Sequence, residues 1–269
     1  MKKLIFSICL MLLCVALFNS RAYASFIYDL DLFGVSTGSS TFTDDFSDGT
    51  VPSTGSTYYV IGDIISTRES GGLLELNSED AVGDTEKEIW LRYLDAISTS
   101  TTGNDRYVMG KFQVNNGFYP DTYFGIDMIH RTSGGGTPAI EGDAWMDTYT
   151  DSSGNIYANW GDDISIDMSM DITALIGSNK EITMKLAIDS SNMISAMWDF
   201  YTDGVLGGSF HQNNFMPLIF SAGDYYLGGI GVVEVLPVPE PTTIALLGIG
   251  LVGLAGAAAR RRRKRSPVA

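Results

Sequence analysis

The residues best suited to acid–base chemistry are carboxylates that share one face of a predicted strand. Glu141, Asp143 and Asp147 occupy odd-numbered positions, and alternate residues of a strand point to the same side. Two carboxylates that face a substrate together can hydrolyse a glycosidic bond. Trp145 interrupts the alternation of acids on this face. We therefore interpret the acids as solvent-facing groups and predict that the protein is not an enzyme, with a glycoside hydrolase as the alternative.

Three aspartates could supply hard oxygen ligands to a metal ion. Asp44, Asp45 and Asp48 lie beside Gly49, and calcium is bound through carboxylate oxygens. Phe46 stands where an EF-hand loop needs Asp or Asn, so the EF-hand pattern fails. We predict that no cofactor is required and that the candidate metal is a structural calcium, with a solvated acidic turn as the alternative.

Two tryptophans are candidates for contact with sugar rings. Trp145 and Trp160 lie next to Asp143 and Asp162, and aromatic faces stack on pyranose rings but also fill protein cores. We predict that Trp145 and Trp160 belong to a glycan-binding face. Trp198 lies within an apolar alternation and is predicted to be core.

Other motifs that resemble reactive sites lack the context they need. Residues 34–38 match G-x-S-x-G, but a nucleophile elbow requires a strand-to-helix turn in an α/β fold. Residues 248–253 match G-x-G-x-x-G, but they follow no predicted strand and no acidic residue comes after them. His130 and His211 have no second metal ligand at a recognisable spacing. None of these motifs is assigned a function.

The segments that position these residues have a period of two, which is typical of strands. In residues 181–189 and 193–201, alternate positions are apolar, and the Asp-Ser-Ser-Asn sequence between them favours a turn. We predict a β-hairpin here and an all-β, two-sheet antiparallel sandwich overall. Further strands are predicted in 108–114, 123–129, 145–149, 156–160, 164–172 and 225–235.

The first 24 residues have the features of a signal peptide. Lys2 and Lys3 precede an apolar run, and Ala22 and Ala24 provide the small residues that signal peptidase needs before Ser25. We predict cleavage at this point and passage through the secretion machinery. Both cysteines of the chain lie within this segment, so the exported domain is predicted to contain no disulfide.

The predicted exported domain, residues 25–237, is strongly acidic. It holds 31 of the 32 acidic residues, whereas nine of the 17 basic residues lie in the terminal segments, which leaves a formal charge of about −23. A field of this sign repels phosphate backbones. We therefore predict no nucleic-acid partner.

The C-terminal segment, residues 238–269, combines three features. Val238, Pro239, Glu240 and Pro241 precede the uncharged residues 242–259. As a helix this run would measure about 27 Å, close to the roughly 30 Å of a bilayer core. The following cations favour a cytoplasmic position for residues 260–269. They are Arg260, Arg261, Arg262, Arg263, Lys264 and Arg265.

This order of motif, helix and basic cluster resembles the PEP-CTERM sorting signal. The resemblance implies recognition at Val238–Pro241 by an exosortase-type enzyme in a Gram-negative bacterium that makes extracellular polysaccharide. It also implies a transient inner-membrane anchor, followed by delivery to the cell surface or the extracellular matrix.

The exported domain resembles the opening of concanavalin A-like jelly-roll domains. The residues that carry the resemblance are an Asp-Asp-Phe strand and a Gly-rich turn at 44–49, then Gly71-Gly72-Leu73 and Leu76. The resemblance implies a lectin- or glucanase-like sandwich whose last strand, 227–235, pairs near the first. It also implies a structural calcium near these strands, with Glu234 as an additional ligand.

Together these features predict a cell-surface or matrix protein with a non-enzymatic sandwich that binds extracellular polysaccharide. The alternative is a structural or adhesive matrix protein without a defined ligand.

Overall fold

The computed structural model divides into two compact units, residues 1–235 and 236–269. All residues that the structure describes belong to the first unit. These are residues 26–50, 52–54, 57–62, 69–79, 81–83, 86–98, 106–132, 143–162, 165, 167–217 and 224–235.

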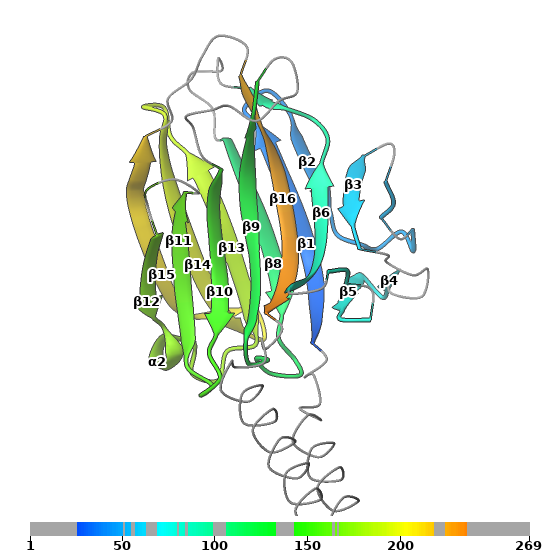
Figure 1. Ribbon diagram of the computed structural model, residues 1–269, viewed down its shortest axis with the longest axis vertical. Helices are drawn as coiled ribbons and strands as arrows, with labels where there is room; N and C mark the ends of the chain where they lie inside the picture. Colours follow the sequence, from blue (N-terminus) through cyan, green and yellow to red (C-terminus); the bar gives the residue numbers. More distant parts are fainter. Residues whose placement is uncertain are drawn as a thin grey trace, which may run out of the picture. The chain divides into compact units, whose positions relative to one another are not determined.

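The first sheet, sheet A, has the strand order β15-β14-β13-β8-β1-β5-β4, with β2 paired to β1 (Figure 1). The alternating apolar residues of these strands turn towards the second sheet. Their bounds are β1 Ile27–Thr37, β2 Thr41–Asp44, β4 Glu69–Ser70, β5 Leu73–Asn77, β8 Arg106–Gln113, β13 Glu181–Ile188, β14 Met193–Thr202 and β15 Val205–Pro217.

The second sheet, sheet B, has the order β12-β11-β10-β9-β16-β6-β3, with β7 paired to β16. The named strands of both sheets pair antiparallel, so the predicted all-β two-sheet antiparallel sandwich is confirmed. The bounds are β3 Tyr58–Ile61, β6 Glu86–Tyr93, β7 Ile97–Ser98, β9 Thr122–Arg131, β10 Ala144–Thr150, β11 Ile156–Asp162, β12 Asp167–Asp171 and β16 Tyr225–Val235.

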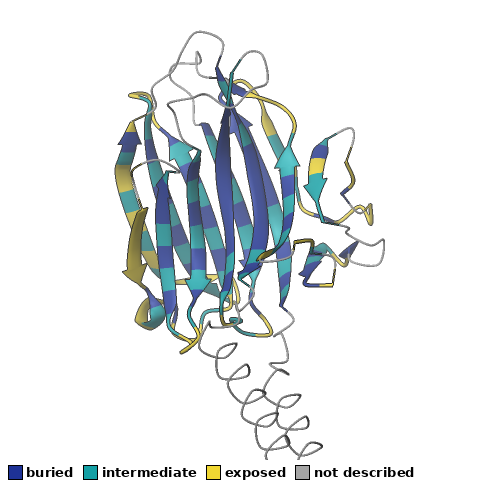
Figure 2. Cartoon of the chain, viewed as in Figure 1, coloured by how far each residue is buried: buried dark blue, intermediate teal, exposed yellow. Residues whose placement is uncertain are grey.

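The core lies between the two sheets, and the hairpin β13–β14 shows how the sequence builds it. Apart from Thr202 at the end of β14, even-numbered residues of both strands are buried and odd-numbered residues are not, which gives the alternation of colours in Figure 2. Oδ1 of Asp189 accepts hydrogen bonds from the backbone N–H groups of Ser191 and Met193, both at 2.8 Å. This turn fixes the register, and the predicted hairpin is confirmed. Trp198, predicted to be core, is fully buried.

Two local expectations differ from the structure. Within the predicted strand 164–172, residues 167–171 form the edge strand β12, which is exposed along its length; Met168 and Met170 are 51% and 48% exposed. The last strand, β16, pairs with β6 and β9 in sheet B, whereas β1 lies in sheet A. The expectation that the last strand pairs near the first is therefore wrong. The short helix α2, Thr173–Ile176, follows β12.

Candidate functional site

A groove crosses the outer face of sheet B, and strand register places its residues in rows. One row runs from Asp147 on β10 through Gly125 on β9 and Gly231 on β16 to Trp90 on β6. The adjacent row contains Trp145, Asp127, Gly229 and Arg92 on the same four strands. Each tryptophan is thus carried by an outer strand of the four, with β9 and β16 between them.

Glycines form the floor between the two tryptophans. A Cβ atom on Gly231 would lie 2.5 Å from Cδ2 of Trp90, and one on Gly125 would lie 2.8 Å from Cβ of Asp147. Real side chains do not approach this closely, because such contacts overlap the atomic radii. Glycine at both positions therefore leaves room for the neighbouring side chains and for a cavity above the sheet.

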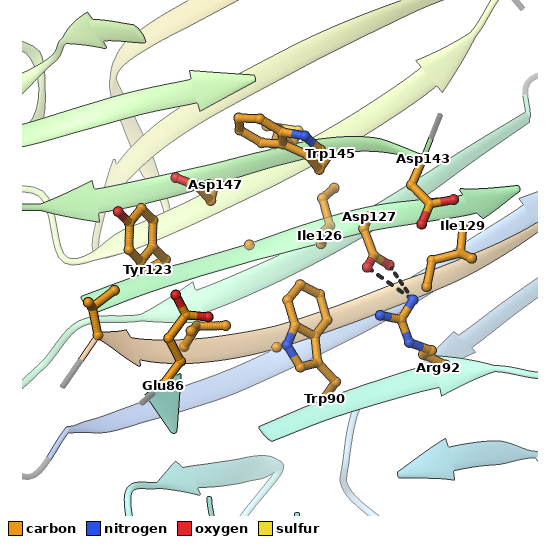
Figure 3. Close-up of a pocket in the computed structure, with 15 residues that line it drawn as sticks. Glu86, Trp90, Arg92, Tyr123, Ile126, Asp127, Ile129, Asp143, Trp145 and Asp147 are labelled. Atoms are coloured by element: carbon orange, nitrogen blue, oxygen red, sulfur yellow. Dashed lines mark hydrogen bonds and ion pairs between the residues drawn. The ribbon is translucent and has the colours of Figure 1, made fainter. Parts of the chain in front are cut away.

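The resulting space, here named the Trp90–Trp145 groove, has a volume of about 400 Å³. Figure 3 shows Trp145 and Trp90 on opposite sides of it, with Asp127 and Arg92 towards one end and Tyr123 and Glu86 towards the other. The side chains that line the groove are mainly aromatic and acidic. They include Glu86, Trp90, Arg92, Tyr123, Asp127, Asp143, Trp145 and Asp147.

An ion pair holds one end of the groove. Nη1 of Arg92 lies 3.1 Å from Oδ1 and 3.0 Å from Oδ2 of Asp127. The guanidinium carbon of Arg92 also lies 5.3 Å from the ring centroid of Trp90, which is within the range of a cation–π contact. Arg92 therefore neutralises Asp127 and restrains the Trp90 ring.

Asp147 is a carboxyl group with strongly altered acidity at the floor of the groove. Burial raises its pKa to about 8, and nearby Asp167 acts in the same direction. Nδ2 of Asn159 donates a hydrogen bond to Oδ1 of Asp147 at 2.9 Å, which opposes the shift. Asp147 is therefore mostly protonated at pH 7 and can donate a hydrogen bond to a ligand.

Replacing Asp147 with Asn is expected to stabilise the protein at high pH. The folded-state pKa is raised, so the wild type loses stability as the pH rises from about 4 to about 8, while the unfolded chain ionises more readily. An amide removes this penalty and can still accept the hydrogen bond from Asn159. We expect a gain of about 1–3 kcal/mol at pH 9 and none at pH 4. Urea unfolding at both pH values measures it, and an equal gain at both would contradict the assignment.

The predicted acids and Trp145 share the groove where the structure describes them. Asp143 and Asp147 both line it with Trp145, whereas Glu141 lies outside the described residues. Oδ1 of Asp143 accepts a hydrogen bond from the backbone N–H of His130 at 2.7 Å. Burial raises the pKa of Asp143, and this hydrogen bond opposes the shift.

The other predicted sugar contact, Trp160, lies in the core. Its side chain is 4% exposed, and its ring centroid is 6.0 Å from that of Trp198 and 5.3 Å from that of Phe210. Trp160 therefore has no surface available for stacking on a sugar. The prediction for Trp160 is corrected because β11 directs this side chain between the sheets.

The aspartates predicted to bind calcium form a turn whose carboxylates are already engaged. Asp44 accepts hydrogen bonds from the N–H of Phe46 and the hydroxyl of Tyr58. Asp45 and Asp48 each accept a bond from the backbone N–H two residues ahead. These contacts hold the turn in shape, and among the described residues no group of three or more metal-ligating side chains is arranged to hold an ion.

Glu234 does not join these aspartates. Asp44 pairs with Phe33, which also pairs with Gly110, and Gly110 faces Ile230 across the core. Glu234 lies four residues beyond Ile230 on β16, which corresponds to about 13 Å of strand. It is 4% exposed, and burial raises its pKa.

Calcium binding by Asp44, Asp45 and Asp48 stays a prediction, and Glu69 gives it a sharper test. Glu69 is 8% exposed, Oε1 accepts a hydrogen bond from the N–H of Thr50 at 3.1 Å, and its pKa is raised by burial and by Asp48. A bound calcium ion would offset the repulsion between the carboxylates of Glu69 and Asp48. If calcium binds here, it should raise the melting temperature by several degrees, and the variant Asp48→Asn should show a smaller increase. An unchanged melting temperature after chelation would remove the calcium proposal.

Several groove residues were not predicted from the sequence. Trp90, Glu86 and Arg92 lie on one face of β6, and Gly125 and Gly231 form the floor. The alternation of residues 86–93 was the available signal for Trp90.

The two histidines are accounted for by local contacts. His130 is fully buried, and the centroid of its ring lies 4.8 Å from that of Tyr226, on which it stacks. Nε2 of His211 lies 3.0 Å from Oδ1 of Asp199.

The terminal predictions lie outside the described residues. These are the cleavage site at Ala22, Ala24 and Ser25, the helix 242–259 and the basic residues 260–265. Within the part of the chain that is described, no helix has the length and apolar character needed to cross a bilayer.

Comparison with known proteins gives one distant structural similarity and one match to a sorting motif at the C-terminus. A solved structure with some similarity is an endo-beta-1,4-glucuronan lyase from the fungus Trichoderma reesei, at 12% identity and a TM-score of 0.23, covering 67% of this chain and 87% of the lyase chain. A likeness at this level carries no argument about chemistry. No curated protein matches the chain. Residues 237–263 match the PEP-CTERM protein-sorting motif, so the chain carries the signal that marks an exported protein for processing by an exosortase.

Proposed function

We propose that the protein is a non-enzymatic matrix or cell-surface protein that binds a polysaccharide chain in the Trp90–Trp145 groove. The sorting motif supports delivery through an exosortase. Residues 242–259 would hold the chain temporarily in the inner membrane of a Gram-negative bacterium, with residues 260–269 in the cytoplasm. After processing, the domain would remain at the cell surface or in the extracellular polysaccharide.

The observation that carries the glycan proposal is the pairing of two indole rings across a cavity of about 400 Å³. Aromatic rings provide flat apolar faces, and the carboxyl groups around them can bond to hydroxyls. The aromatic surface continues beyond the groove, because the rings of Tyr123 and Tyr149 stack with centroids 4.3 Å apart. A chain of several sugar units matches this extended surface better than a single small molecule.

A polysaccharide array probed with the purified full chain tests the proposal. Binding to at least one polysaccharide is expected, and binding to none, with or without calcium, would contradict it and favour a structural matrix protein without a ligand. Release of new reducing ends from a bound glycan would contradict the non-enzymatic assignment. In that case Asp143→Asn and Asp147→Asn would be expected to stop the release.

A further inference from the structure

The charge of the Trp90–Trp145 groove is unusual for a site that binds sugar. Four carboxyl groups line it, from Glu86, Asp127, Asp143 and Asp147, and the one cationic side chain among the described lining residues is Arg92. Arg92 is bound to Asp127 through both carboxylate oxygens, at 3.1 and 3.0 Å. That pair has little charge to offer a ligand, because each member offsets the other.

The remaining three carboxyl groups differ in their readiness to carry charge. Asp147 is mostly protonated at neutral pH, since burial raises its pKa to about 8. Glu86 is exposed at one end of the groove. Asp143 accepts the backbone hydrogen bond of His130 near the other end. The neighbouring cation of β9, Arg131, donates from Nη1 to the carbonyl of His130 at 2.9 Å. Burial raises the pKa of Asp143, whereas the hydrogen bond from the N–H of His130 and the nearby charges of Arg131 and Arg92 lower it, so these cations offset part of its negative charge. Glu86 and Asp143 thus place one carboxyl group on each side of the aromatic centre, and Glu86 is the more exposed of the two.

Resting on the proposed function, we infer that the groove takes an amine-bearing glycan, a chain of glucosamine-type units, in preference to a neutral or a uronate chain. Protonated sugar amines would pair with Glu86 and Asp143, and ammonium groups are also attracted to the faces of indole rings. A uronate chain would bring carboxylates against the carboxylates of the lining. The overall charge of the protein, −15, adds to this discrimination.

The experiment compares four probes by calorimetric titration of the full chain at pH 6 and low salt. The probes are hexamers of glucosamine, N-acetylglucosamine and glucuronate, and tetralysine. We expect the glucosamine hexamer to bind at least tenfold more tightly than the N-acetylated hexamer, and the glucuronate hexamer not to bind. Raising the salt concentration should weaken glucosamine binding more than N-acetylglucosamine binding, because exposed charges are screened.

Substitutions test whether Glu86 and Asp143 cause the preference for the glucosamine hexamer. The double variant Glu86→Gln, Asp143→Asn should bring the ratio of the two hexamer affinities close to one, and the amide introduced at position 143 retains an acceptor for the N–H of His130. If this variant does not fold, Glu86→Gln alone should lower the ratio at least threefold, since Glu86 is exposed. The control Asp203→Asn removes one exposed carboxylate in the turn between β14 and β15 of sheet A and should leave the ratio unchanged.

The outcomes separate the two proposals. Equal binding of both hexamers, or binding of no hexamer, would overturn the amine preference, whereas only the absence of binding to every polysaccharide of the array would overturn glycan binding itself. A glucosamine preference that survives in the double variant, or is lost in Asp203→Asn, would overturn the role of the groove carboxylates. Tetralysine binding as tight as that of the glucosamine hexamer would show that the groove selects cationic peptides, and would overturn the glycan assignment.

Discussion

A chain with alanine at both Trp90 and Trp145 is expected to bind its glycan roughly 30- to 160-fold more weakly than the wild type. The two rings flank the groove, and each ring lost removes a contact of about 1–1.5 kcal/mol, which is close to a tenfold change in affinity. Titration of wild type and variant with the polysaccharide identified on the array measures the effect.

The matched control for this variant is Tyr107→Ala. Tyr107 is a half-buried aromatic residue on β8 of sheet A, where the ammonium group of Lys185 lies 4.3 Å from its ring centroid. It shares ring type and partial exposure with the groove residues but lies in the other sheet. Comparable loss of affinity in Tyr107→Ala, or retained affinity in the double tryptophan variant, would place the binding surface elsewhere.

Replacing Pro239, Glu240 and Pro241 with alanine is expected to block processing completely in the native host. The motif lies within the matched residues 237–263, and the substitution removes all three side chains of its Pro-Glu-Pro sequence. The variant should retain an epitope placed after Ala269 and accumulate in the membrane fraction. Immunoblotting of cell fractions measures both effects.

Pro267→Ala is the control for the sorting experiment, because this proline lies beyond the matched segment. It should be processed like the wild type. Normal loss of the epitope from the triple-alanine variant would mean that another feature of the chain directs processing.

Local sequence patterns predicted those parts of the fold that depend on local structure. The hairpin β13–β14 has strict alternation on both strands and a turn closed by Asp189, so its register follows from about twenty neighbouring residues. The pairing of β16 with β6 and β9 joins segments more than ninety residues apart. Such pairing depends on the packing of the whole sandwich, and no local pattern specifies it.

The candidate site was predicted in part for the same reason. Asp143, Trp145 and Asp147 are close in sequence around β10, so their common face followed from the period of a strand. The opposite wall, with Trp90, comes from β6, and only the completed sheet brings the two walls together. The burial of Trp160 could be predicted from the sequence. Trp160 lies on the same face of β11 as Ile156 and Ala158, which are both apolar and buried.

The four tryptophans allow a direct measurement of where a glycan binds. Trp90 and Trp145 line the groove, whereas Trp160 and Trp198 are 4% and 0% exposed in the core. Each indole N–H gives one resonance in a nitrogen–proton correlation spectrum. On titration with the bound glycan, we predict shifts for the resonances of Trp90 and Trp145, and none for those of Trp160 and Trp198. Binding that leaves the resonances of Trp90 and Trp145 unmoved would contradict the assignment of the groove.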